Sequence, residues 1–359
     1  MNRAFWNGRR VFLTGHTGFK GSWLALWLSS LGSEVTGYAR APLATQRLYD
    51  LLKLKDRITS VIGDVTDRAR LETAIKDASP EIVIHMAAQP LVQLSYEDPV
   101  DTYNTNVMGT VHLLDVVRYV PSVRSTVIVT TDKCYQNNEW IWPYREADRL
   151  GGDDPYSNSK ACAELVTHAF IKSYFTRDAG AAATSLVASA RAGNVIGGGD
   201  WAGNRLIPDV VRAKQNAEKL VLRNPYATRP WQFVLEPLRG YLALAEALSE
   251  TGTDFVGGWN FGPVEEDSQS VEWVVRRFCG HFDYADGFTI DAGEFHPEKQ
   301  LLRLDISKAA HQLNWWPAMP LSEALRFTAD WYASHLRAED DIETSLRQIA
   351  EYETLVGIG

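Results

Sequence analysis

The chain has 359 residues, of which 45% are hydrophobic and 23% charged, and its formal net charge is −9 at pH 7. This length suffices for two lobes, while the acidic balance argues against a nucleic-acid-binding groove. No apolar run of about 18 residues, no signal-peptide pattern and only three cysteines occur, so we expect a cytoplasmic protein without a membrane span.

Strand and helix patterns alternate along roughly the first 190 residues, which predicts a parallel, doubly wound α/β sheet. The predicted strands are residues 10–14, 34–38, 60–64, 82–86, 127–129 and 184–190. The predicted helices of this part are residues 19–31, 67–76, 100–119 and 157–175. Beyond residue 191 the alternation is less regular, with helices predicted at residues 206–217, 236–250, 270–281, 306–313 and 321–335 and a strand end at 258–262.

A glycine-rich turn, Thr14-Gly15-His16-Thr17-Gly18-Phe19-Lys20-Gly21, joins the first strand to the first helix. Its G-x-x-G-x-x-G spacing lets the backbone turn tightly and approach a pyrophosphate, and the helix N-terminus offers free N–H groups. Gly21 lets the helix lie close to the sheet. A tight turn without a ligand is the alternative, but the strand–turn–helix setting favours dinucleotide binding and a Rossmann-type domain.

The segment expected to hold the adenosine half is less regular. In NAD-binding domains, an acidic residue about 20 positions after the glycine turn hydrogen-bonds the adenosine ribose. This chain has Gly37-Tyr38-Ala39-Arg40 in that region. Arg40 suits either the 2′-phosphate of NADP or a stacked adenine, so the residues alone leave both cofactors open. Asp64 is expected to accept a hydrogen bond from the adenine amino group, or else to cap the next helix.

Tyr156 and Lys160 lie four residues apart on a predicted helix and therefore share a face. A neighbouring ammonium stabilises a phenolate, so Tyr156 can accept the proton of a sugar hydroxyl while a hydride leaves for a nicotinamide. Lys160 would also bind the nicotinamide ribose, and Thr131, after the predicted strand 127–129, would hydrogen-bond the same sugar hydroxyl. An isolated pair would more often be an exposed helical pair, but here it occurs together with the glycine turn.

These features resemble the extended short-chain dehydrogenase/reductase family across essentially the whole chain. The motifs that carry the resemblance are Gly15/Gly18/Gly21, Asp64-Val65, His85-Met86-Ala87-Ala88-Gln89, Asn106, Thr131, Tyr156/Lys160 and Arg191-Ala192-Gly193-Asn194-Val195. The resemblance implies bound NAD, with NADP left open by Arg40. The residues that it implies for the cofactor are Gly15, Thr17, Gly18, Phe19, Gly21, Arg40, Asp64, Val65, Ala87, Ala88, Gln89, Asn106, Tyr156 and Lys160. It also implies a homodimer or homotetramer formed through helices 100–119 and 157–175.

Within this family, the residues after the predicted strand 127–129 resemble the sugar 4,6-dehydratases, which usually carry Thr-Asp-Glu there. This chain has Thr131-Asp132-Lys133, and the lysine variant is similar to the dehydratases that act on CDP-glucose. The motifs at residues 154–160, 198–201, 229–238 and 304–309 agree with that group, apart from Phe233 in place of a histidine. The alternatives are a 4-epimerase, a dehydratase for another nucleotide sugar, or a non-catalytic dinucleotide-binding regulator, which would be expected to lose Tyr156 or Lys160.

The resemblance implies conversion of CDP-glucose to CDP-4-keto-6-deoxyglucose and water, for deoxysugars such as those of lipopolysaccharide O-antigen. Tyr156 would act as base at C4, Asp132 would protonate the C6 hydroxyl, and Lys133 or a nearby group would remove the C5 proton. Lys133 can be a base only when it is neutral, which requires a lowered pKa. The alternative is an ammonium that orients Asp132 or stabilises the enolate.

Arginines that could bind a nucleotide diphosphate follow in the second half of the chain. Arg205, Arg229 and Arg303 are the candidates because guanidinium groups match phosphate oxygens bidentately, although each could be a solvated surface residue. Asn194 and Leu206 are expected to border the same site, and the histidines show no metal-ligand spacing. We therefore expect a dinucleotide-binding domain of residues 1–192 plus about 225–265, and a smaller, mixed C-terminal lobe of residues 193–224 plus 266–359 that binds the nucleotide sugar.

Overall fold

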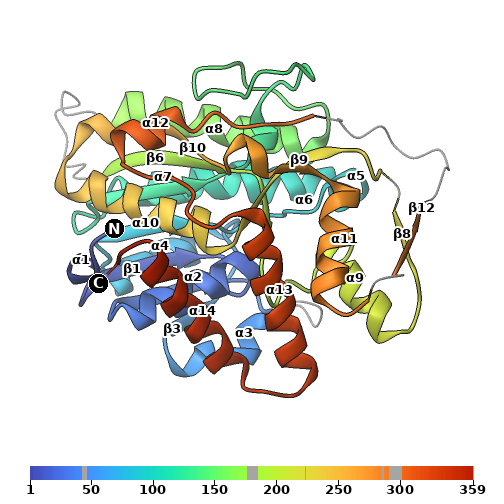
Figure 1. The fold of residues 1–359 in the computed structure, drawn as a ribbon. Helices are drawn as coiled ribbons and strands as arrows, with labels where there is room; N and C mark the ends of the chain where they lie inside the picture. The colour runs from blue at the N-terminus through green and yellow to red at the C-terminus, as the bar shows by residue number, and fades with distance from the viewer. Residues whose placement is uncertain (43–46, 176–184, 223, 285–286, 291–300, 359) are drawn as a thin grey trace.

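The computed structural model describes residues 1–42, 47–175, 185–222, 224–284, 287–290 and 301–358 (Figure 1). Its centre is a seven-stranded sheet in the order β10-β6-β5-β4-β1-β2-β3, in which every neighbouring pair is parallel. The strand order reverses between β1 and β4, which creates a ligand-binding crevice at the carboxyl ends of the strands. The predicted doubly wound α/β fold is confirmed.

The strands of this sheet agree with the predicted ones to within a few residues at each end. Their bounds are β1 (Arg10–Thr14), β2 (Glu34–Ala39), β3 (Thr59–Ile62), β4 (Ile82–His85), β5 (Ser125–Val129), β6 (Leu186–Ala192) and β10 (Gly257–Phe261). β3 ends before Gly63 and Asp64, which were predicted to be part of it, because the chain turns there toward the next helix. Thr184, the predicted start of β6, lies outside the described residues.

Alternate residues of the central strands enter two cores on opposite faces of the sheet. On β1, Val11 and Leu13 pack into the core shared with α2 (Phe19–Ser30) and α10 (Leu235–Glu250). Phe12 packs into the other core, with α4 (Arg68–Ala78), α7 (Gly109–Val117) and α8 (Pro155–Tyr174). Because both faces are covered, the strands are apolar on both sides, as is usual for a parallel sheet.

The predicted helix 100–119 is interrupted. It consists of α6 (Pro99–Tyr103), a π-helical turn η2 (Asn104–Met108) and α7. A π-helical turn widens the backbone by one residue and re-aims the side chains on it, and such turns are frequent at functional sites. Asn106 lies in this turn. Shorter helices elsewhere in this part are α1 (Arg3–Trp6), α3 (Leu48–Leu51), η1 (Leu54–Asp56), α5 (Val92–Glu97) and η3 (Asp132–Cys134).

The C-terminal half adds two small sheets and a group of helices. The strands are β7 (Asn194–Ile196), β9 (Thr228–Phe233) and β11 (Ser268–Ser270) in one sheet, and β8 (Leu220–Leu222) and β12 (Phe288–Ile290) in the other. The helices are α9 (Leu206–Gln215), η4 (Thr253–Phe255), η5 (Glu265–Asp267), α11 (Val271–His281), α12 (Ser307–Gln312), α13 (Leu321–Leu336) and α14 (Asp341–Leu355). The small sheets and α14 were not predicted. α14 packs against α2, where Glu353 accepts a 2.9 Å hydrogen bond from the Trp27 indole. None of the helices in the described part of the chain combines the length and the hydropathy of a membrane-spanning segment.

Candidate active site

The glycine turn brings the first strand and the first helix into close backbone contact at the carboxyl edge of the sheet. Gly15 has a φ of +78°, and a Cβ there would lie 2.8 Å from the backbone nitrogen of Ala87. A Cβ at Gly21 would lie 2.1 Å from the carbonyl oxygen of Gly15, so α2 can approach the turn only with glycine at this position. The N-cap of α2 is Gly18, which has no side chain to cap the first turn. The N–H groups there suit a pyrophosphate, so this part of the site fits the predicted dinucleotide.

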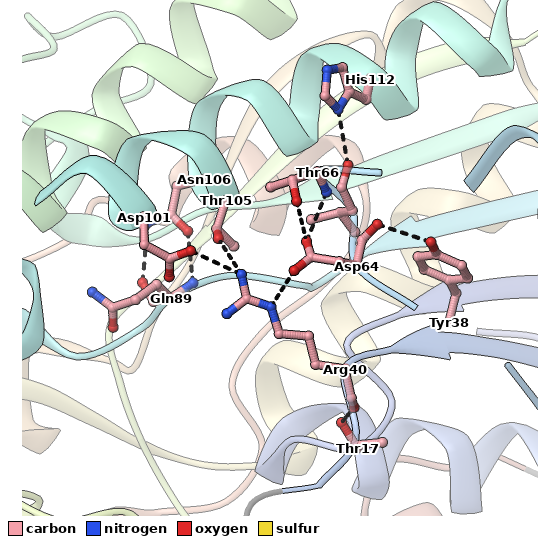
Figure 2. A network of polar contacts seen from close by, with 11 residues as sticks. Thr17, Tyr38, Arg40, Asp64, Thr66, Gln89, Asp101, Thr105, Asn106 and His112 are labelled. Carbon is pink, nitrogen blue, oxygen red and sulfur yellow. Dashed lines mark hydrogen bonds and ion pairs between the residues drawn. The ribbon is translucent and has the colours of Figure 1, made fainter. Parts of the chain in front are cut away.

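The end of this crevice that is expected to hold adenosine has a network centred on Arg40, which directly follows β2 (Figure 2). Its Nε donates a 2.6 Å hydrogen bond to Asp64, and its Nη2 donates to Asp101 at 3.0 Å and to Thr105 at 3.2 Å. Asp64 also accepts from the backbone and hydroxyl of Thr66. The expectation that Asp64 could cap the next helix is wrong, because Asp67 is the N-cap of α4.

The loop after β4 is fixed by side chains from three elements. Asn106 accepts a 2.8 Å hydrogen bond from the backbone of Gln89 and donates to its carbonyl oxygen and to Ser159 of α8. His85 is buried against Thr14, with 2.8 Å between the Thr14 hydroxyl and Nδ1, and burial lowers the pKa of this histidine to about 3. His85 is therefore a neutral core residue, as predicted. The Thr14 hydroxyl also accepts hydrogen bonds from the backbone of Met86 and Ala87, so Thr14 fixes one end of this loop beside the glycine turn and Asn106 fixes the other end at Gln89.

The residues after β5 form a short turn whose side chains face each other. The hydroxyl of Thr131 donates a 2.9 Å hydrogen bond to Oδ1 of Asp132 and accepts one from the backbone of Lys133. Asp132 is only 2% exposed, and its Oδ2 has no hydrogen-bond partner among the described residues. Burial raises the pKa of Asp132 despite the opposing charge of Lys133. A buried carboxyl group that favours its protonated form can act as a general acid.

Tyr156 and Lys160 lie on the first turns of α8, both buried. Asp154 caps the helix by accepting from the backbone of Ser157 at 2.9 Å, and Nζ of Lys160 lies 3.3 Å from the carbonyl oxygen of Val129. Burial raises the pKa of Tyr156 to about 12 and lowers the pKa of Lys160 to about 8. Burial thus outweighs the hydrogen bond of Thr131 and the charge of Arg205, which lower the pKa of Tyr156, and a cationic ligand beside the tyrosine would lower it further.

Sequence reasoning missed a buried ion pair next to these residues. Glu164, one turn after Lys160, is paired with Arg191 of β6 at 2.7 Å, and both side chains are at most 5% exposed. The carboxylate also accepts hydrogen bonds from Thr130, after β5, and from Ser189 of β6. It therefore fixes α8 to the ends of two strands. The available signal was the helical spacing from Lys160 together with an arginine in the Arg191-Ala192-Gly193-Asn194-Val195 motif.

A second missed residue is Lys20, inside the glycine turn. Its Nζ lies 5.9 Å from the ring centroid of Tyr241, whose buried hydroxyl has no hydrogen-bond partner among the described residues. Burial, with the charges of Lys160 and Arg205, lowers the pKa of Lys20 to about 7. Several cationic groups thus act on one another at this end of the sheet, which suits an anionic ligand. A cation within a glycine turn was the signal in the sequence.

The predicted substrate residues are only partly brought together. Arg205 forms a 2.9 Å ion pair with Asp200, and its charge acts on Tyr156. Arg229 is buried on β9, and its charge acts on Asp132. Arg303 is instead paired with Glu265 at 2.5 Å.

The two remaining predicted substrate residues are close to these arginines along the chain or across a strand pair. Asn194 begins β7 and is paired in register with Trp231 of β9, the strand that carries Arg229. Leu206 is the first residue of α9, directly after Arg205. Among the described residues, no group of three or more His, Cys, Asp or Glu side chains is placed to hold a metal ion.

Comparisons with known proteins agree with this architecture. The family model described as GDP-mannose 4,6 dehydratase matches residues 12–328. A CDP-glucose 4,6-dehydratase of Salmonella typhimurium is 50% identical over 353 residues, covering 98% of each chain. A dTDP-glucose 4,6-dehydratase of Xanthomonas campestris is 27% identical over 346 residues, 90% of this chain and 93% of that protein.

Solved structures share the fold at lower identity. A UDP-glucose 4-epimerase of Thermotoga maritima, solved with UDP-glucose, has a TM-score of 0.78 at 20% identity and covers 91% of this chain and 99% of its own. A dTDP-glucose 4,6-dehydratase of Streptomyces venezuelae, solved with NAD, has a TM-score of 0.77 at 20% identity and covers 93% and 99%. Epimerases and dehydratases thus share this scaffold, and the distinction between them depends on the residues of the site.

Proposed function

Because the chain belongs to the family described as GDP-mannose 4,6 dehydratase, we propose that it is an NAD-dependent lyase that converts CDP-D-glucose to CDP-4-keto-6-deoxy-D-glucose and water. The observation that carries the proposal is the buried carboxyl group of Asp132, next to Lys133 and within electrostatic reach of Tyr156. An epimerase works only at C4, whereas a dehydratase also needs an acid for the C6 hydroxyl and a base for the C5 proton. The 50% identity to a CDP-glucose 4,6-dehydratase supports the choice of nucleotide.

The first step is oxidation of the sugar at C4. Tyr156, in the phenolate form that the cationic nicotinamide would favour, accepts the proton of the C4 hydroxyl, and Thr131 hydrogen-bonds the same hydroxyl to orient it. Bound NAD supplies the acceptor of the C4 hydride and, later, its donor. Lys160 binds the nicotinamide ribose. The glycine turn holds the pyrophosphate at the N-terminus of α2.

The second step is elimination of water across C5 and C6. The 4-ketone acidifies the C5–H bond, so a base can remove that proton, and Asp132 transfers its own proton to the C6 hydroxyl as water leaves. The group that removed the C5 proton would return it to C5, and bound NAD would supply the hydride for C6, which completes the 6-deoxy sugar. Lys133 is either the C5 base, when neutral, or an ammonium that orients Asp132 and stabilises the enolate.

We also propose how the substrate is held. Arg205, Arg229 and Arg303 bind the diphosphate, Asn194 reaches the sugar or the diphosphate, and Leu206 borders the same site. In this proposal, residues 1–192 plus about 225–265 form the dinucleotide-binding domain and residues 193–224 plus 266–359 form the sugar-binding lobe. Arg205 falls in the proposed sugar-binding lobe and Arg229 in the proposed dinucleotide-binding domain, and their charges act on Tyr156 and Asp132, so the diphosphate would be held by residues of both parts. Arg303 would have to leave Glu265 to take part.

The proposed assembly is a homodimer or homotetramer formed through the helices α6 to α8. Large apolar side chains are exposed on these helices, including Val100 at 69% and Leu165 at 57%, which supports an interface there. The proposed place of action is the cytoplasm, in the synthesis of deoxysugars such as those of lipopolysaccharide O-antigen.

The proposal is tested by incubating the protein with NAD and, in parallel, with CDP-glucose, UDP-glucose or dTDP-glucose. The expected result is a 4-keto-6-deoxy product from CDP-glucose, in preference to the other two sugars, without accumulation of reduced cofactor. Conversion of CDP-glucose to its C4 epimer would favour the epimerase alternative. Preference for another nucleotide would retain the reaction and contradict the choice of CDP.

A further inference from the structure

Arg40 lies where three connections meet at the carboxyl edge of the sheet (Figure 2). It follows β2, Asp64 comes shortly after β3, and Asp101 lies on α6. The hydroxyl of Thr17, in the glycine turn, donates a 3.1 Å hydrogen bond to the carbonyl oxygen of Arg40. Because the glycine turn suits the pyrophosphate, Arg40 lies on the side where the adenosine half of a dinucleotide would be bound.

The donors of the Arg40 guanidinium are largely occupied. Of its five N–H groups, the one on Nε is used by Asp64 and the two on Nη2 serve Asp101 and Thr105. Only Nη1 donates to none of the described residues. A phosphate bound in the bidentate manner typical of arginine would therefore have to displace Asp64 or Asp101. We term these two residues the carboxylate clamp.

The charge of the cluster also disfavours a phosphate. The hydrogen bonds from Thr66 and Arg40 outweigh burial and lower the pKa of Asp64, so this carboxylate is ionised at neutral pH. Together with Asp101, it gives two negative charges around one positive charge, and the cluster is net negative. A phosphomonoester carries about −1.5 to −2 charges at pH 7 and would be repelled here. The ribose diol of NAD carries no charge and meets no such repulsion.

We propose that the carboxylate clamp turns Arg40 from a receptor for a 2′-phosphate into a residue that admits NAD and rejects NADP. In this arrangement the guanidinium offers its planar face to adenine, and the clamp fixes its orientation before the cofactor binds. This proposal rests on the proposed function, in which a nicotinamide dinucleotide binds at the glycine turn. The preference for NAD then arises because the two carboxylates repel the 2′-phosphate of NADP and occupy the N–H groups of Arg40. No acidic residue directly after β2 is needed for it.

The test measures equilibrium binding of NAD and of NADP, by calorimetry, to the full chain and to Asp101→Asn, alone and combined with Asp64→Asn. We expect the natural chain to prefer NAD. Because the side chains of Asp64 and Asp101 are 32% and 38% exposed, freeing Arg40 should improve NADP binding about tenfold in the double variant and less in the single one. The gain should shrink as ionic strength rises.

Two further variants identify the cause. Asp98→Asn removes a charge from the same part of the chain without touching Arg40, and asparagine also caps helices well, so this variant should leave both affinities unchanged. Adding Arg40→Gln to the double variant should abolish the gain in NADP binding, because the gain depends on the freed guanidinium.

The proposal is overturned if NADP binds the natural chain as tightly as NAD, or if neither cofactor binds. It is also overturned if the folded clamp variants bind NADP with unchanged affinity, or if Asp98→Asn raises the NADP affinity as much as they do. Turnover of CDP-glucose, measured on the same samples, separates this outcome from the proposed function. Dehydration with an unresponsive NAD-to-NADP ratio contradicts only the clamp. A responsive ratio without dehydration contradicts only the proposed reaction.

Discussion

The buried ion pair between Glu164 and Arg191 leads to a prediction about stability. The substitution Glu164→Gln keeps the size of the side chain but removes its charge. Glu164 accepts hydrogen bonds at both carboxylate oxygens, from Thr130 on one side and from Ser189 and Arg191 on the other. The glutamine amide has only one oxygen, so its NH₂ group must face either Thr130 or the pair Ser189 and Arg191, which are hydrogen-bond donors. The buried Arg191 also loses its counter-charge.

The expected loss in free energy of unfolding is about 3–5 kcal/mol, the range for removing one partner of a buried pair. In a chain of this size, such a loss lowers the melting temperature by about 4–7 °C. The matched control is Glu323→Gln, which breaks the 2.8 Å pair with Arg326. Its side chains are 42% and 48% exposed, so the loss should stay below about 1 kcal/mol.

The effect has a defined pH dependence. Burial alone would raise the pKa of Glu164, but Arg191, Thr130 and Ser189 outweigh it and lower the pKa. A carboxyl group whose pKa is lower in the folded state stabilises the protein at pH values above its pKa in the unfolded state. This contribution is lost as the pH falls through its pKa in the folded state. The difference in melting temperature between the natural chain and Glu164→Gln should therefore persist at neutral pH and shrink in acid. Equal, small losses in Glu164→Gln and Glu323→Gln would refute the reasoning.

Two other substitutions test the predicted chemistry. Asp132→Asn cannot transfer a proton to the C6 hydroxyl, so steady-state turnover should fall about 10²–10⁴-fold. Reduced nicotinamide, measured by its absorbance, should still form when CDP-glucose is added. Unchanged turnover would show that Asp132 is not the acid. Lys133→Met should stop exchange of the C5 proton with solvent deuterium if the lysine is the base, whereas near-normal exchange with slower loss of water would assign it to orienting Asp132.

Much of the fold could be predicted because local patterns determine it. The alternation of apolar strands with helices fixed the parallel sheet, and the glycine spacing located the turn at which the backbone of Gly15 approaches Ala87. The π-helical turn at Asn104–Met108 was not predictable, because its apolar spacing resembles that of an ordinary helix. α14 was missed although the sequence carried its signal, since Asp340 caps it and its buried Ile342, Ile349 and Tyr352 lie at helical spacing.

The motifs of the site could be predicted from the sequence, but the side-chain partners of its charged residues could not. Thr131, Asp132, Tyr156 and Lys160 were located from their spacing after a strand and on a helix. The partners of Arg40 could not be read from the sequence, because Asp101 is 61 positions away and meets it only through the sheet order. The same holds for Glu164 and Arg191, 27 positions apart, which the topology brings together inside the protein.

The central claim, dehydration through a transient 4-ketone, is tested most directly with CDP-glucose that carries deuterium at C4. The prediction is a CDP-4-keto-6-deoxyglucose with the deuterium at C6 and no net reduced cofactor, because the hydride taken from C4 returns to C6 of the same sugar. Deuterium that remains at C4 of an epimerised sugar, or that accumulates in reduced nicotinamide, would contradict the proposed reaction.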